Sequence, residues 1–76
     1  MDPAKCAVLL KAVELGSITA AADALGYTPS GASRLIASLE ADAGFPLLVR
    51  SKSGVAVTAE GAVLLPRLAE LAAASR

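Results

Sequence analysis

Apolar residues recur along the first 44 positions with the spacing of three amphipathic helices. Each stripe follows a residue that commonly caps a helix, namely Asp2, Ser17 or Thr28, and each is followed by a glycine. Proline comes directly after Asp2 and Thr28, and proline is tolerated at the first helical position. The apolar positions of the stripes are Cys6, Leu9, Leu10 and Val13; Ile18, Ala21, Ala22 and Leu25; and Ala32, Ile36, Leu39 and Ala43. The sequence therefore predicts three consecutive helices.

A different pattern follows Gly44. Two short runs compatible with β-strands, Leu47–Arg50 and Val55–Val57, flank a segment whose serines and glycine favour a turn, which predicts a hairpin. Thr58 then caps a fourth predicted helix, in which Pro66 predicts a kink. The apolar stripe of this helix consists of Leu64, Leu65, Leu68, Leu71 and Ala72.

The second and third predicted helices are joined by only a few residues, and the third opens with small hydroxyl residues and Arg34. This is the layout of a helix-turn-helix, whose second helix enters the DNA major groove. The complete order predicts a mostly α fold with a small β-hairpin, which is a winged helix-turn-helix. We expect residues 1–58 to form this domain, and residues 59–76 to form a C-terminal helix that continues beyond the end of this sequence.

The composition restricts the size and class of the fold but does not indicate a function. The 76 residues allow one small domain, 55% apolar but only 3% aromatic, which favours helices. A mean hydropathy of +0.62 indicates apolar surface that an assembly or a longer protein covers. Seven Lys and Arg balance seven Asp and Glu, and this neutrality counts against a nucleic-acid partner.

The chemistry-bearing residues exclude several classes of protein. Histidine is absent and Cys6 is the single cysteine, so the sequence predicts no enzyme, no metal site, no cofactor and no disulfide. Cys6 lies on the apolar stripe, which predicts a buried, inert thiol. No run is long enough to span a membrane and no signal peptide is visible, so we expect a cytoplasmic protein.

Four motifs carry a resemblance to a known family: Ser17-x-Thr19-x-Ala21-Ala22-x-x-Leu25, Ser33-x-x-Ile36-x-x-Leu39-Glu40, Gly44-x-x-Leu47-x-x-Arg50 and Thr58-x-x-Gly61. With them the chain resembles, over most of its length, the N-terminal DNA-binding domain of LysR-type transcriptional regulators. The resemblance implies a winged helix-turn-helix, a linker helix that pairs with its twin in a dimer, and a C-terminal effector-binding domain. That last domain is absent from these residues, and any small-molecule effector would belong to it.

The departures from the family pattern concern base recognition. The family usually has glutamine and then proline at the first turn of the recognition helix, where this chain has Pro29 and Ser30. A phenylalanine of the family is Leu48 here, and a second wing arginine is Ser53. These differences predict DNA binding that is weaker, differently specified, or dependent on DNA shape.

The candidate DNA-binding residues are Thr19, Thr28, Ser30, Ser33, Arg34, Arg50 and Lys52. Arg34 lies off the buried stripe and is expected to contact a guanine edge or a phosphate, although a solvated arginine would look the same. Thr28 is expected to act both as a helix cap and as a DNA contact. Arg50 and Lys52 flank the wing turn, where they contact the DNA backbone or are ordinary edge-strand charges. We expect Lys52 to take the place of the missing wing arginine.

The candidate dimer interface consists of Leu64, Leu65, Leu68 and Leu71. This stripe carries more apolar surface than one small domain easily covers. The hairpin and the first predicted helix can take only part of it, so we expect the stripe to remain exposed enough to pair with a second copy.

The leading functional prediction is sequence-specific binding of double-stranded DNA by a bacterial transcriptional regulator. The alternative is a winged-helix module that has lost DNA binding and serves dimerisation or partner docking. Zero net charge and the missing glutamine favour the alternative. Arg34 and the pair Arg50 and Lys52 favour DNA binding.

Overall fold

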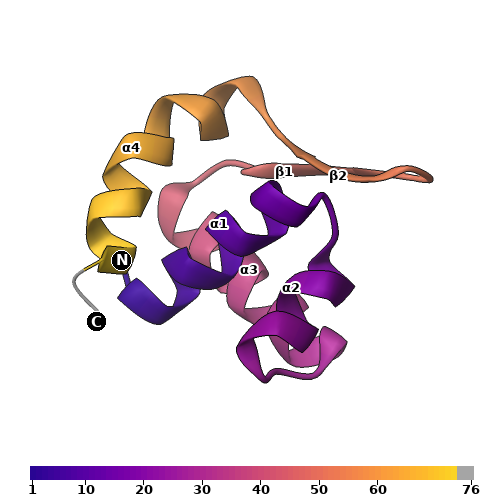
Figure 1. The fold of residues 1–76 in the computed structure, drawn as a ribbon. Coiled ribbons are helices and arrows are strands. Elements are labelled where there is room, and N and C mark those ends of the chain that lie inside the picture. Colours follow the sequence, from indigo (N-terminus) through magenta and orange to yellow (C-terminus); the bar gives the residue numbers. More distant parts are fainter. Residues whose placement is uncertain (74–76) are drawn as a thin grey trace.

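The computed structural model describes residues 1–73. Its elements in chain order are α1 (Pro3–Leu15), α2 (Ile18–Leu25), α3 (Pro29–Ala43), β1 (Leu48–Ser51), β2 (Gly54–Val57) and α4 (Ala59–Ala73) (Figure 1). This order confirms the predicted mostly α fold with one β-hairpin. Residues 74–76 of the predicted segment 59–76 lie outside the described residues.

The first three helices begin and end where local chemistry predicts. Asp2, Ser17 and Thr28 each accept a hydrogen bond from a main-chain N–H of the helix that follows. Each helix ends at a glycine with left-handed backbone, a conformation that side chains other than glycine rarely adopt. These ends depend on residues close in sequence, which is why spacing alone located them.

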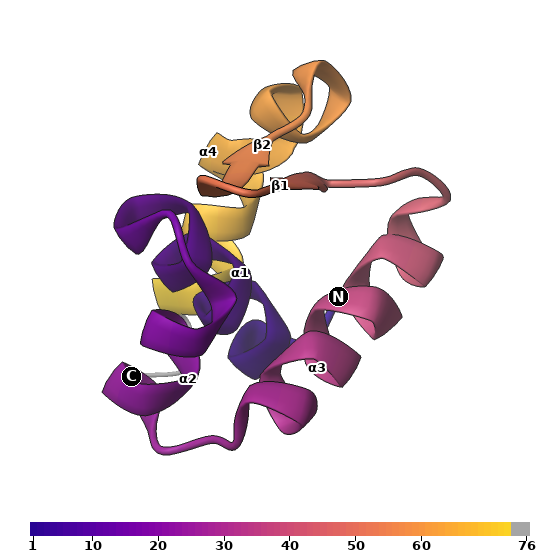
Figure 2. The same cartoon turned by 90° about the vertical axis from the view of Figure 1, so that its right-hand side faces the viewer.

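Helix α1 is packed against the other three helices and forms the centre of the core (Figures 1 and 2). Cys6 and Leu9 of its predicted stripe are fully buried, but Leu10 and Val13 are only partly buried, while Val8 and Ala12 are fully buried. All four residues of the predicted stripe are in the core or pack against it, but the stripe is incomplete because a helix surrounded by neighbours buries more than one face. Leu25 at the end of α2 is another exception, since it is 38% exposed.

The thiol of Cys6 has no exposed surface, and this burial raises its pKa. A buried thiol whose pKa is raised is a poor nucleophile, because the thiolate is the reactive form. The predicted buried thiol is confirmed.

Helix α4 lies along α1, and this packing corrects the expectation of an exposed leucine stripe. Leu68 is fully buried, so its predicted exposure is wrong, and Leu64, Leu65 and Leu71 are half-buried against the core. The large apolar side chain that α4 does expose is Val63, 79% accessible. Pro66 lies inside the helix, and Figure 1 shows α4 bent along its length.

The two strands form an antiparallel hairpin in which Ser51 pairs with Gly54. The N–H of Val55 donates to the carbonyl oxygen of Gly16, 3.0 Å away, so the hairpin is fixed to the turn between α1 and α2. A side chain at Gly54 would collide with that same carbonyl oxygen, which explains the glycine better than turn geometry does. In residues 1–73, no helix has the length and apolar character needed to cross a membrane.

Candidate nucleic-acid interface

The outer face of helix α3 consists mainly of small residues and carries little charge. Ser30, Arg34 and Ala37 are exposed and follow one another at helical spacing, and Ser33 beside them is half-buried. Arg34 is the single cationic residue of α3. Because its neighbours on this face are small, the helix can approach another surface closely, with Arg34 extending furthest.

The start of α3 is held by its cap. The N–H of Gly31 donates to Thr28 Oγ1 at 3.0 Å, and Thr28 Oγ1 lies 3.4 Å from Ser30 Oγ. The capping role of Thr28 is confirmed, and its side chain remains exposed. Both hydroxyl groups therefore stand at the open N-terminal end of α3, where the helix dipole favours an anion.

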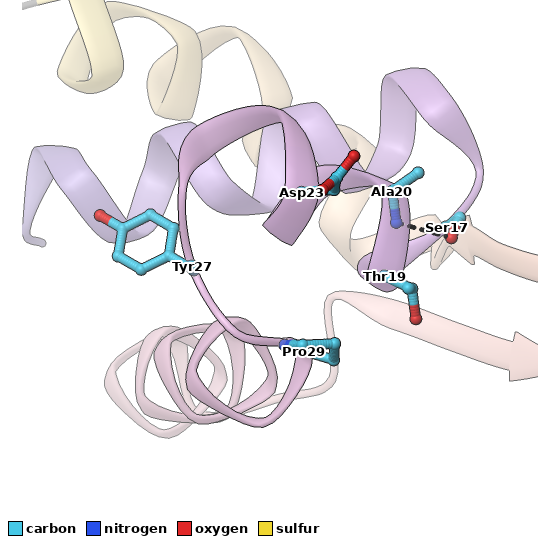
Figure 3. Close-up of a pocket in the computed structure, with 6 residues that line it drawn as sticks. All are labelled: Ser17, Thr19, Ala20, Asp23, Tyr27 and Pro29. Carbon is cyan, nitrogen blue, oxygen red and sulfur yellow. Dashed lines mark hydrogen bonds between the residues drawn. The ribbon is translucent and has the colours of Figure 1, made fainter.

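Helix α2 meets the start of α3 across an open cavity of about 380 Å³. Figure 3 shows its lining, which comes from both elements: Ser17, Thr19, Ala20, Asp23, Tyr27 and Pro29. Thr19 is exposed here, whereas the Ser17 hydroxyl accepts the N–H of Ala20 and acts as the helix cap. Asp23 adds one exposed carboxylate, and Pro29 has no donor to offer a base.

The hairpin, or wing, carries the second group of candidate residues. Arg50 pairs with Val55 across the strands and lies on the same face of the hairpin as Leu48. Lys52 is in the turn, and both cations are exposed. Figure 2 looks onto the side of the molecule that α3 and the hairpin border together. The structure therefore places the two predicted groups on elements that share one side.

The cations are distributed unevenly. Lys11 pairs with Glu14 at 2.9 Å, and Arg67 pairs with Glu70 at 3.3 Å, each on its own helix. The ion pairs of residues 1–73 include neither Arg34 nor the two wing cations. Lys5 of α1 is outside these ion pairs too, but its Nζ donates to Ser38 Oγ at 2.6 Å. The neutral net charge thus conceals three exposed cations on α3 and the wing that no ion pair compensates.

The sequence predicts no role for Glu40 beyond its place in a motif. Its Oε2 accepts the N–H groups of Leu47 at 2.6 Å and Leu48 at 3.1 Å, and so ties the wing to α3. Glu40 lies a fixed distance before the predicted strand, which is the feature of the sequence that could have indicated this contact. The contact crosses a loop, and neither helical nor strand periodicity predicts contacts across a loop.

The motif Thr58-x-x-Gly61 also has a structural explanation. Thr58 Oγ1 accepts the N–H of Gly61 at 2.9 Å and donates to the carbonyl oxygen of Pro46 at 2.8 Å. A Cβ atom at Gly61 would lie 2.7 Å from the carbonyl oxygen of Leu47. A larger residue there would push α4 away from the base of the wing.

Comparison with known proteins points the same way. Residues 4–62 match the family described as bacterial regulatory helix-turn-helix protein, lysR family. The chain is 48% identical over 59 residues to the HTH-type transcriptional regulator LysG of Mycobacterium bovis, an alignment that covers 78% of this chain and 20% of LysG. The chain therefore spans about a fifth of the length of this curated relative.

Solved structures show the same fold. The crystal structure of VV2_1132, a LysR family transcriptional regulator, superposes with a TM-score of 0.90 at 31% identity, covering 99% of this chain and 26% of that one. The crystal structure of a CbnR_DBD–DNA complex superposes with a TM-score of 0.84 at 35% identity, covering 99% of this chain and 90% of that one. The crystal structure of a BenM_DBD complex with catB site 1 DNA superposes with a TM-score of 0.86 at 31% identity, covering 99% of this chain and 81% of that one.

Proposed function

The chain belongs to the lysR family of bacterial regulatory helix-turn-helix proteins and has the fold of its DNA-binding domain, and from this premise we propose how it binds double-stranded DNA. Helix α3 enters the major groove and the wing lies over the adjacent phosphates. The observation that carries this proposal is the set of cations without ion pairs on α3 and the wing.

Within the groove, Arg34 is the residue that contacts base edges. It is exposed on the outer face of α3, and a guanidinium can donate two hydrogen bonds to guanine. Ser30 and Ser33 flank it and donate to bases or phosphates. Thr28 and Thr19, at the starts of α3 and α2, donate to the DNA backbone.

On the wing, Arg50 and Lys52 neutralise phosphates. Both are exposed and neither is held by an acidic partner in residues 1–73. Such contacts strengthen binding to every sequence rather than to one. The neutral net charge is compatible with this proposal, because Lys11 and Arg67 are paired with acids of their own helices and the wing cations are not.

We also propose that the regulator is a homodimer through residues 59–76. Leu68 is occupied by the core, so the contact uses the outer face of α4, where Val63 is exposed, with the half-buried Leu64, Leu65 and Leu71 at its edge. A two-fold pair would place two copies of α3 on one face of the duplex. If the whole regulator binds an effector, we place that site outside residues 1–76.

Selection from a library of randomised duplexes tests this function. The chain is expected to enrich a sequence with two related half-sites, centred about one helical turn or more apart. Retention of duplexes without sequence enrichment would contradict specific recognition. No retention at low salt would contradict DNA binding itself.

A further inference from the structure

Glu40 closes the loop between the recognition helix and the wing. Its carboxylate accepts the N–H groups of Leu47 and Leu48 at 2.6 and 3.1 Å, and its main-chain carbonyl oxygen accepts the N–H of Gly44 at 2.9 Å. Leu47 has no exposed surface and Leu48 is only 8% exposed. One residue of α3 therefore fixes both the end of its own helix and the start of β1.

Two main-chain hydrogen bonds also hold the wing, but neither comes from α3. The N–H of Thr58 donates to the carbonyl oxygen of Leu47 at 2.9 Å, and the N–H of Val55 donates to that of Gly16 at 3.0 Å. They join the hairpin to the start of α4 and to the turn after α1. Glu40 is thus the side chain that joins the wing directly to the helix carrying Arg34.

The chain path makes this joint relevant to DNA. Arg34 precedes Glu40 by six residues on one continuous helix, a rise of about 9 Å, and Arg50 follows Leu48 by two residues on β1. Contacts to a base edge and to phosphates are made together only when the groups that make them are held at a fixed separation.

We propose that Glu40 is a positioning residue for DNA binding, which sets where Arg50 and Lys52 lie relative to Arg34. The inference rests on the proposed DNA-binding function. Glu40 itself touches no DNA in this account; it acts through the backbone of Leu47 and Leu48.

Two substitutions separate its length from its charge. Glu40→Asp keeps the negative charge but shortens the side chain by one methylene, so the carboxylate no longer spans to both N–H groups. Glu40→Gln removes the charge but keeps the length and an oxygen that accepts both bonds. The readout is the slope of log K against log salt for a duplex, which reports the number of phosphates neutralised.

Glu40→Asp is expected to lower this slope by about two, the contribution of the two wing cations, while Glu40→Gln keeps the wild-type slope. Arg50→Ala should lower the slope by about one in the wild type and by almost nothing in Glu40→Asp. A wild-type slope for Glu40→Asp, or equal losses in the two variants, would overturn the inference.

Folding is checked by circular dichroism. If Glu40→Asp is partly unfolded, all variants are compared in one concentration of sucrose, which favours the compact state. A variant that stays unfolded there would make Glu40 a stability residue and would also overturn the inference. Absence of salt-dependent binding by the wild type would instead refute the proposed function.

Discussion

Helices α3 and α4 are both 15 residues long and both bury one face, yet their outer faces differ in chemistry. The outer face of α3 is lined by small residues around Arg34, which is in no ion pair of residues 1–73. The outer face of α4 exposes Val63, and its cation Arg67 is held by Glu70. The first face suits a polyanion, and the second suits an apolar partner.

This difference shows why net charge is a poor guide to the partner of a small domain. The chain is neutral overall, but Lys11 of α1 and Arg67 of α4 are each paired with an acid of the same helix. Lys5, the other cation of α1, donates to the Ser38 hydroxyl at 2.6 Å. What a phosphate meets is therefore the local charge of α3 and the wing.

The largest effect is expected where α4 enters the core. Leu68→Ala removes a fully buried side chain that packs with α1, and should lower the free energy of unfolding by about 2–5 kcal/mol. Val63→Ala on the same helix should change it by less than about 0.5 kcal/mol. Urea denaturation measures both, and similar values for the two variants would contradict the packing of α4.

Arg34→Ala should reduce affinity for the selected sequence by about 1–3 kcal/mol, or about 5- to 150-fold, because the base contact is lost. The fold should remain intact, since Arg34 is exposed. Arg67→Ala is the matched control on α4 and should leave affinity unchanged. Fluorescence anisotropy with the selected duplex compares them, and unchanged affinity for Arg34→Ala would remove it from the site.

Val63→Glu should shift the dimer toward monomer without unfolding it, because a charge is placed in the proposed apolar contact. Affinity for a two-half-site duplex should fall by about tenfold or more, since the second half-site no longer binds intramolecularly. Ala41→Glu adds the same charge to exposed α3 and should leave the dimer unchanged. Sedimentation across a concentration series is the measurement, and a wild-type chain that is monomeric at high micromolar concentration would refute the dimer.

The sequence predicted the ends of the helices well because capping is local. Asp2, Ser17 and Thr28 bond to N–H groups two or three residues away, and such pairs are visible as spacing. The hairpin was located in the same way, from Ser51 and Gly54 between two β-compatible runs.

Contacts between distant residues were not predictable. An amphipathic stripe shows that Leu68 needs an apolar partner, but not whether α1 or a second copy covers it. The hydrogen bond between Glu40 and Leu47 crosses a loop, and the hydrogen bond from Val55 to Gly16 joins residues that are far apart in the sequence. For the candidate site, Arg34 and the wing cations were predictable from the sequence, but the ion pairs of Lys11 and Arg67 were not.

The most direct test of the central claim compares two double variants with the same change in net charge. Arg50→Ala with Lys52→Ala removes the wing cations, and Lys11→Ala with Arg67→Ala removes two cations that are held in ion pairs. The slope of log K against log salt should fall by about two for the first and stay at the wild-type value for the second. Equal changes in the two slopes would mean that binding follows net charge, and would contradict a DNA-binding side built from α3 and the wing.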